Sequence, residues 1–349
     1  MGAIFFIFGF QEYGDTSSYI EAIHWFQGKS EEVSPWRVLR PLGPLIALPF
    51  EFLGEGAGLI LQNIIFYLLS AFLIFKITEL IYHNKKQALF ASLFFVTATQ
   101  VLGVGLAYLT DMGAWFFYLL SIFLTLLYFK NKNEKLIVLN GLLSGVGFLM
   151  KENGALGILF FGMMVLLSKE FQLKEKISKI IHFGIFFLIP VAALQFFMYQ
   201  YFHLTSFDWY LSHGQANAEG TLLIFLRYLG QLFRTLGLLW IFFFIGAFQE
   251  WKEKNWERMK VFLALLPSSF SFFLWPISGG GRVVFIFAPL GILLATRGLV
   301  FLDNKLGKKR GALMIILLLL TILIVNYCFC YLNPTIPFID ILAEFLGIL

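Results

Sequence analysis

Long apolar segments follow one another along almost the whole chain, with short polar loops between them. They lie at residues 1–10, 57–80, 87–107, 112–129, 136–150, 153–168, 180–201, 235–249, 261–277, 283–301 and 311–332. A helix needs about 20 apolar residues to cross the ~30 Å hydrocarbon core of a bilayer. We therefore expect an all-α fold, a polytopic transmembrane helix bundle with about 10–11 spans. The segments 136–150 and 153–168 form either two of these spans or a re-entrant hairpin.

Composition supports one membrane domain rather than soluble ones. Charged residues make up 13% of the chain, about half the share in a soluble domain. We expect one transmembrane domain over residues 1–349, with no separate soluble domain and with short amphipathic helices in an outer loop. The net charge of +5 comes from short basic clusters between apolar segments, which orient a protein in a bilayer and do not indicate a nucleic-acid partner.

Basic residues mark alternate loops. Most of the 26 Lys and Arg residues lie in five loops, at 83–86, 130–135, 169–179, 250–260 and 303–310. Short loops rich in Lys and Arg stay in the cytoplasm. The loops at 11–40 and 202–234 then face outward, and long loops with polar and aromatic residues often carry function. We predict a multi-pass protein of the plasma (inner) membrane whose active side faces outward.

Two aspartates stand at this outer rim. Asp15 follows the first apolar segment, and Asp111 separates two later ones. A carboxylate there can accept a proton from a hydroxyl group or hold a metal ion. The alternative for each is a helix cap, which for Asp15 would begin a helix at Thr16–Phe26.

Two cations lie on the same side. Lys151 interrupts an apolar stretch against the expected charge bias, so it binds either a lipid phosphate or a carboxylate such as Glu152. Arg282 follows three glycines, which allow a close backbone approach to a ligand, and Arg is suited to phosphate. A tight glycine turn is a weak signal by itself.

Three further groups are weaker candidates. Arg37 and Arg40 sit among prolines and contact either a phosphate or the lipid headgroups. The loop at 202–234 holds metal-ligand types without a tight spacing, and aromatic residues typical of a membrane interface; they are His203, Asp208, Trp209, Tyr210 and His213. Cys328 and Cys330 lie two apart in an apolar segment, where small packing residues are expected.

The order of these motifs resembles a known superfamily. A short span precedes Gly14-Asp15 and Tyr19, and Arg40-Pro41-Leu-Gly-Pro-Leu comes before the next span. Thr110-Asp111, Leu149-Met-Lys151-Glu152 and Arg282 through Pro289 then follow in turn. Over roughly residues 1–300, this chain is similar to the C-type (GT-C) glycosyltransferases, which include the protein O-mannosyltransferases and the lipid A aminoarabinose transferases.

The resemblance implies transfer of a hexosyl or pentosyl group from a polyprenyl-phosphate sugar donor to a glycan, lipid or protein acceptor on the outer face. By similarity, Asp15 and Asp111 are the catalytic carboxylates, and Lys151, Arg282 and Arg40 bind the donor phosphate. A divalent metal ion is a possible cofactor, with Asp15 and His203 as weak candidate ligands. The first span is shorter than usual. Many relatives carry a second acidic residue directly beside the first aspartate, whereas here Glu12 lies three residues before Asp15.

Two other functions remain as alternatives. A lipid-linked substrate transporter or flippase predicts a polar cavity at the membrane midplane, which span centres almost free of charged residues do not favour. A non-catalytic membrane scaffold predicts that the candidate residues lie apart, each with a local partner. An enzyme predicts that Asp15, Asp111, Lys151 and Arg282 lie together.

Overall fold

The computed structural model describes residues 10, 12–203, 205, 208, 221–274 and 281–331. Within these ranges the regular structure is helical and contains no strand, which confirms the predicted all-α fold. Several predictions fall outside the described residues, namely the span 1–10 apart from Phe10, two of the three glycines before Arg282 (Gly279 and Gly280), Trp209, Tyr210, His213 and the tail from residue 333.

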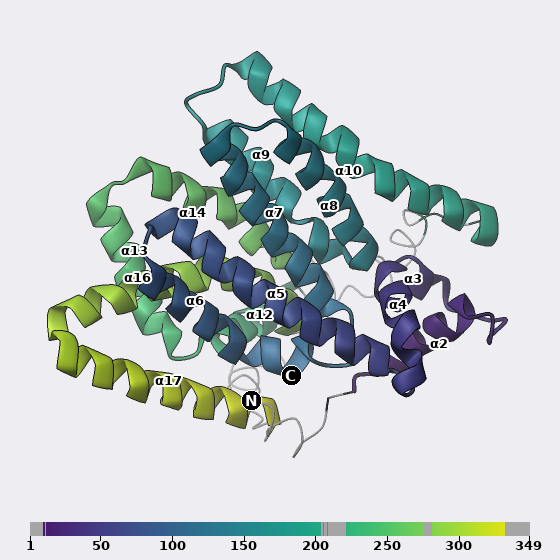
Figure 1. Ribbon diagram of the computed structural model, residues 1–349, viewed down its shortest axis with the longest axis horizontal. Helices are drawn as coiled ribbons and strands as arrows, with labels where there is room; N and C mark the ends of the chain where they lie inside the picture. The colour runs from purple at the N-terminus through teal and green to yellow at the C-terminus, as the bar shows by residue number, and fades with distance from the viewer. Residues whose placement is uncertain are drawn as a thin grey trace.

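Short helices form the segment before the first long one. They are α2 (Thr16–Phe26), α3 (Pro35–Val38), α4 (Leu42–Ala47) and the 3-10 helix η1 (Leu48–Leu53). Figure 1 shows α2, α3 and α4 gathered at one end of the long helix α5 (Ala57–Tyr82). The helix predicted at Thr16–Phe26 has these bounds in the structure.

The middle of the chain forms a packed group of long helices. After α5 come α6 (Lys85–Thr97), the π-helix η2 (Val101–Gly105), α7 (Asp111–Asn131), α8 (Lys135–Met150), η3 (Glu152–Ala155), α9 (Gly157–Leu167) and α10 (Leu173–Phe202). The predicted span 87–107 is broken here, because α6 ends at Thr97 and η2 follows. Helix α5 packs against both α6 and α7, and α7 packs against α8.

The last third of the chain returns to this group. It contains α12 (Thr221–Leu236), α13 (Leu239–Glu253), α14 (Trp256–Ser269), η4 (Ser271–Leu274), α15 (Gly281–Val284), η5 (Phe285–Phe287), α16 (Ala288–Leu306) and α17 (Lys308–Tyr331). Helices α12 and α13 meet at a bend of 86°. Helix α12 occupies part of the loop predicted at 202–234.

Within the described residues, four helices are long and apolar enough to cross a bilayer, or five if the bent pair counts as one span. The four are Ala57–Tyr82, Asp111–Asn131, Leu173–Phe202 and Arg282–Leu306. Shorter apolar helices occur at Leu42–Leu53, Lys135–Met150, Glu152–Leu167 and Leu313–Ile322. The polytopic bundle is confirmed, and the predicted ten or eleven crossings require that shorter helices such as these cross as well.

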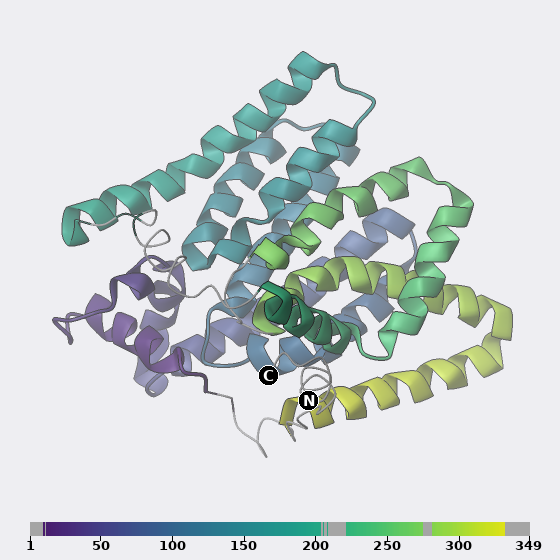
Figure 2. The same ribbon diagram turned by 180° about the vertical axis from the view of Figure 1, so that it is seen from behind.

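Equal hydropathy accompanies very different burial. Of the apolar stretch in Arg282–Leu306, 94% is buried inside the protein, against 11% of that in Leu173–Phe202. Helices α10 and α17 lie on opposite edges of the bundle in both views (Figures 1 and 2). Their outward side chains are large and apolar, among them Ile185, Leu188 and Leu317. Such faces suit contact with lipid tails.

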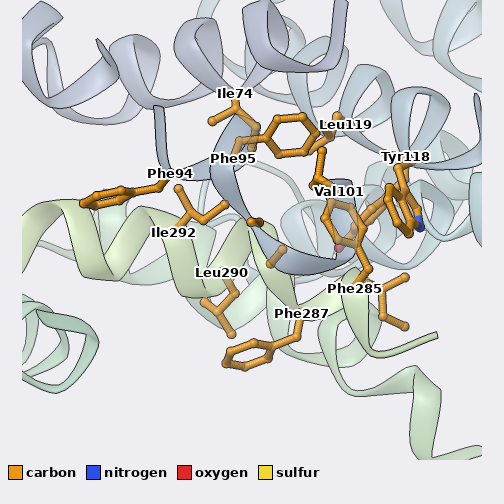
Figure 3. Packing of buried hydrophobic residues seen from close by; sticks show 14 of the residues in the cluster. Ile74, Phe94, Phe95, Val101, Tyr118, Leu119, Phe285, Phe287, Leu290 and Ile292 are labelled. Atoms are coloured by element: carbon orange, nitrogen blue, oxygen red, sulfur yellow. The ribbon is translucent and has the colours of Figure 1, made fainter. Parts of the chain in front are cut away.

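Aromatic side chains fill the core between these layers. Figure 3 shows Phe95, Tyr118 and Phe285 packed together with aliphatic residues from several helices. The Tyr118 hydroxyl lies 2.7 Å from Ser268 Oγ, so its polar atom has a partner inside the core. This packing joins the first half of α7 to the beginning of the α15–α16 segment.

The basic loops meet at one end of the bundle. Lys86 pairs with Asp303, which joins the loops at 83–86 and 303–310. Lys179 Nζ lies 2.6 Å from Glu134 Oε1, which joins the loops at 130–135 and 169–179. Since α7 enters this end at its last turn, its first residue, Asp111, lies at the other end.

Candidate active site

Asp15 is held between two arginines. Its Oδ1 lies 2.8 Å from Arg37 Nη2, and its Oδ2 accepts a hydrogen bond of 2.7 Å from Arg282 Nη1. Asp15 occupies the N-cap position of α2, but its side chain makes no capping hydrogen bond. The cap alternative therefore explains the position of Asp15 and not the use of its carboxylate.

Asp111 lies at the centre of the same group. It is the first residue of α7, directly after the N-cap residue Thr110, and it is fully buried. Its Oδ1 accepts a hydrogen bond of 2.6 Å from Lys151 Nζ, and its Oδ2 one of 3.0 Å from Arg282 Nη2. Arg282 thus bridges Asp15 and Asp111, which the sequence predicted to share one face.

An aromatic stack explains why Arg282 reaches Asp111. Trp115 lies one helical turn after Asp111, and Phe285 lies three residues after Arg282. The two rings stack with centroids 3.5 Å apart and planes at 24°. This fixes the beginning of α7 against the α15–α16 segment, so the two charged side chains face each other.

Lys151 reaches the group from a break between two helices. Helix α8 ends at Met150, and Lys151 has an extended backbone (φ −173°, ψ 154°) before η3 begins. Close contact between Gly147 and Gly154 holds this break, because a Cβ on Gly154 would lie 2.4 Å from the Gly147 carbonyl oxygen. Of the two alternatives for Lys151, the structure shows a carboxylate partner, and it is Asp111 rather than Glu152.

Glu152 pairs with Arg40 instead. Its Oε1 lies 2.7 Å from Arg40 Nη2 and accepts a hydrogen bond of 2.9 Å from Arg40 Nε. The Arg40 guanidinium also lies 3.9 Å from the ring centroid of Trp36. Arg37 and Arg40 are both buried, which does not fit the predicted alternative of simple headgroup contact.

Tyr19 forms the floor of the group and was not among the predicted site residues. It is fully buried, its hydroxyl accepts a hydrogen bond of 3.0 Å from Thr110 Oγ1, and Arg37 lies 4.4 Å from its ring centroid. Burial raises the pKa of the phenol, but nearby Arg40, Lys151 and Arg37 outweigh it and lower the pKa overall. Its place four residues after Asp15 on a helix is the sequence signal for a shared face.

We name this group the Asp111 cluster. Its members are Asp15, Arg37, Arg40, Asp111, Lys151, Glu152 and Arg282. They come from α2, α3 and the turn after it, α7, the α8–η3 break and α15. Four cations and three carboxylates leave one net positive charge. That excess suits a group with one negative charge.

Two donors of the cluster are not used by the protein. Arg37 Nη1 and Arg282 Nε are buried and have no hydrogen-bond partner among the described residues.

Partial burial raises the pKa of Asp15, but the bonds and charges of Arg282 and Arg37 outweigh it and hold the pKa below its usual value. Asp15 is therefore ionised at neutral pH, and each of its two carboxylate oxygens is paired with an arginine.

The metal candidates do not form a ligand set. Among the described residues, no group of three or more His, Cys, Asp or Glu side chains is arranged to hold an ion. The Asp15 carboxylate faces two guanidinium groups. His203 ends α10, where its backbone N–H bonds the Tyr199 carbonyl oxygen and its ring contacts Tyr199. Asp208 bonds the backbone N–H and hydroxyl of Thr205, a local turn.

Comparison with known proteins bears on the fold. Residues 45–196 match the family model of dolichyl-phosphate-mannose-protein mannosyltransferases. The oligosaccharyltransferase of Archaeoglobus fulgidus, in its apo crystal structure, superposes with a TM-score of 0.58 over 97% of this chain at 13% identity. The resemblance to the C-type glycosyltransferases is confirmed. The matched segment includes Asp111 and Lys151, and the Asp111 cluster adds partners from outside it.

The structural match covers almost all of this chain but only part of the oligosaccharyltransferase chain. This chain spans 53% of the oligosaccharyltransferase chain, or about half its length. No curated protein matches the sequence. At 13% identity the structural likeness supports the fold alone, and the reaction must be argued from the cluster itself.

Proposed function

We propose that this protein is a membrane glycosyltransferase that moves a sugar from a polyprenyl-phosphate donor to an acceptor on the outer face of the plasma membrane. The observation that carries the proposal is the Asp111 cluster, in which residues far apart in sequence converge with one positive charge in excess. The scaffold alternative predicted that these residues lie apart, each satisfied locally. They instead share one network.

The donor phosphate is the group that this excess charge would bind. A sugar linked to a lipid through one phosphate is a phosphodiester with one negative charge. Arg282 and Lys151 already lie side by side on Asp111, and buried cations of this kind stabilise phosphate oxygens strongly. The cluster lies at the beginning of helix α7, which is one end of a candidate membrane span. A phosphate at the rim of the membrane would meet the cluster there.

The three carboxylates would then have different roles. The Asp15 side chain is 37% exposed, whereas Asp111 is 0% and Glu152 15% exposed. An acceptor hydroxyl has its best access to Asp15, which we assign as the general base. Asp111 is the second active-site carboxylate and orients Lys151 and Arg282 toward the phosphate.

The reaction follows from these roles. The acceptor oxygen forms a bond to the anomeric carbon of the sugar and gives its proton to Asp15. The bond between that carbon and the phosphate oxygen breaks, and the polyprenyl phosphate leaves with the electron pair. Arg282 and Lys151 stabilise the charge that develops on the leaving phosphate.

Donor binding would also prepare the base. Arg37 and Arg282 hold both oxygens of Asp15, which lowers its basicity. A phosphate that binds these arginines competes with Asp15 for them. The carboxylate is then free to accept a proton only when the donor is present, which favours binding of the donor before the acceptor.

The outward orientation rests on charge. The basic loops at 83–86, 130–135, 169–179 and 303–310 are joined by ion pairs at the end opposite the cluster. If these loops face the cytoplasm, the Asp111 cluster faces outward. We propose one membrane domain in the plasma membrane of a bacterium or an archaeon.

A transfer assay tests the proposal. Membranes that contain the wild type, Asp15→Asn or Glu31→Gln receive a panel of radiolabelled polyprenyl-phosphate sugars. Glu31→Gln is the matched control, since it removes an exposed carboxylate from the same loop. We expect transfer by the wild type and the control, and a loss of about 100-fold or more in Asp15→Asn. Folded wild-type protein that translocates a lipid-linked sugar without transferring it would favour the flippase.

A further inference from the structure

A groove lies at the end of the bundle opposite the Asp111 cluster. Two adjoining cavities, of about 430 and 270 Å³, share Leu80, His83 and Lys130 as lining residues. Their walls come from the last turns of α5 and α7, the beginning of α6 and the first half of α14. The proposed sugar transfer does not use this groove.

The groove is strongly basic. It is lined by the cations Lys76, Lys85, Lys130, Arg258 and Lys260, and by the carboxylates of Glu79 and Glu257. Arg258 pairs with Glu250 and Glu253 outside the groove, so the other four cations and the two carboxylates leave two positive charges. This excess predicts an anionic ligand.

The excess charge is concentrated on two lysines. Lys76 pairs with Glu79 and Lys260 with Glu257, at 2.8 and 2.6 Å. In contrast, Lys85 and Lys130 form no ion pair within the described residues. Both are exposed on the groove and available to a ligand.

One lysine of the groove is buried inside the protein. Lys260 is 4% exposed, and its ammonium group lies 5.2 Å from the ring centroid of Phe129. Keeping a lysine buried costs free energy unless partners compensate it. Its only carboxylate partner in the described part of the chain, Glu257, is 74% exposed to solvent. An anion in the groove would supply a further compensating charge.

The groove also has an apolar wall. Leu80, Ile81, Phe123, Leu126 and Leu127 line it beside the cations. A free inorganic anion gains nothing from such a wall, whereas a lipid places a phosphate on the basic rim and its acyl chains against the apolar residues. The ligand class that fits both halves is an anionic phospholipid.

The depth of the groove in the membrane also fits a phospholipid headgroup. Helix α7 runs from Asp111 in the cluster to Lys130 in the groove, which is about 30 Å of helix. That is roughly the hydrocarbon thickness of a bilayer. The groove thus meets the headgroups of the leaflet opposite the Asp111 cluster.

We propose that this groove is a binding site for an anionic phospholipid of that leaflet. The lipid would hold together the ends of α5, α6, α7 and α14, which meet there. It would stabilise the end of α7 opposite its catalytic residue.

Lipid titration of the purified full chain in detergent tests this site. The probes are dioleoylphosphatidylglycerol and dioleoylphosphatidylcholine, and the readout is the thermal unfolding midpoint as a function of lipid concentration. The variants are Lys85→Gln/Lys130→Gln and, as matched control, Lys252→Gln/Lys305→Gln. The control removes two exposed lysines of the basic loops that do not line the groove.

We expect phosphatidylglycerol to bind the wild type and the control more tightly than phosphatidylcholine does. In Lys85→Gln/Lys130→Gln its apparent affinity should fall about fivefold for each lysine removed. Equal affinity for the two lipids, or an equal loss in the control, would overturn the proposal. So would glycerol phosphate that stabilises the protein as well as phosphatidylglycerol does, because it identifies a simple anion site.

Discussion

Two buried charged networks lie at opposite ends of this protein, and their charge balance differs. At the basic end, Glu250 and Glu253 pair with Arg258 and Arg297, joining α13, α14 and α16. We call this group the Glu250 cluster. Its two carboxylates and two arginines are neutral in sum, whereas the Asp111 cluster has one positive charge in excess.

The difference separates a structural network from a binding site. Glu250 lies 3.0 Å from Arg258 and 3.2 Å from Arg297, so its charge is fully compensated by the chain itself. Buried donors without a hydrogen-bond partner among the described residues occur in both clusters, on Arg37 and Arg282 in one and on Arg258 and Arg297 in the other. The two clusters therefore differ in net charge, and only the Asp111 cluster has a positive charge in excess. Burial and ion pairing alone therefore do not mark a site. A charge left for a ligand does.

The largest difference should come from neutralising the central carboxylate of each cluster. Asp111→Asn takes from Lys151 its carboxylate partner in the described structure, while after Glu250→Gln both arginines retain Glu253. We expect Asp111→Asn to lower the free energy of unfolding by about 3–5 kcal/mol and transfer by about 100-fold or more. Glu250→Gln should cost less stability and leave transfer within about threefold. Thermal unfolding and sugar transfer measure both effects, and equal loss of transfer would remove the distinction.

A glycine near each cluster gives the next comparison. A Cβ on Gly154 would meet the Gly147 carbonyl oxygen at 2.4 Å, and one on Gly298 the Phe242 carbonyl oxygen at 2.0 Å. Alanine at either position should destabilise by about 1–3 kcal/mol. Gly154→Ala should also displace Lys151 and reduce transfer by about 10- to 100-fold. A fully active Gly154→Ala protein would show that the position of Lys151 is unimportant.

The pH dependence of Asp15 sharpens the comparison further. Arg282 and Arg37 lower its pKa in the folded protein, so its contribution to stability is present above the unfolded value of about 3.9. That contribution is lost as the pH falls through the lower folded value. Between pH 6 and pH 3, the unfolding midpoint of the wild type should therefore fall more steeply than that of Asp15→Asn. Parallel curves would mean that the arginine pairs do not form.

The smallest effect is expected at an exposed pair. Lys132 and Glu170 are about half exposed and pair across two basic loops. Lys132→Gln should change the free energy of unfolding by about 0.2–1 kcal/mol and leave sugar transfer unchanged. A loss of transfer here would show that charge at the basic end influences the reaction.

The sequence predicted the helices better than their surroundings. Helix α5 begins at Ala57 and α7 at Asp111, at or next to the predicted starts of their spans. Hydropathy did not distinguish α10 from α16, because lipid tails and a protein core demand the same apolar side chains. Only packing decides which of them is buried.

For the site, the sequence likewise predicted which residues meet but not which of them pair. The order and common sidedness of Asp15, Asp111, Lys151 and Arg282 predicted that they would meet. Sequence gives no distances, so it left Lys151 open between a phosphate and a carboxylate. The pairing of Glu152 with Arg40 depends on the backbone turn at Lys151 and on the placement of α3. Local spacing does not encode either.

Binding of unlabelled polyprenyl phosphate to Arg282→Gln and Arg297→Gln tests the central claim most directly. The pair is matched, because after Arg282→Gln the carboxylates retain Arg37 and Lys151, and after Arg297→Gln they retain Arg258. The account predicts that Arg282→Gln weakens binding about tenfold or more, while Arg297→Gln binds as the wild type does. Equal affinity of the two variants would contradict the assignment of the Asp111 cluster as the donor-phosphate site.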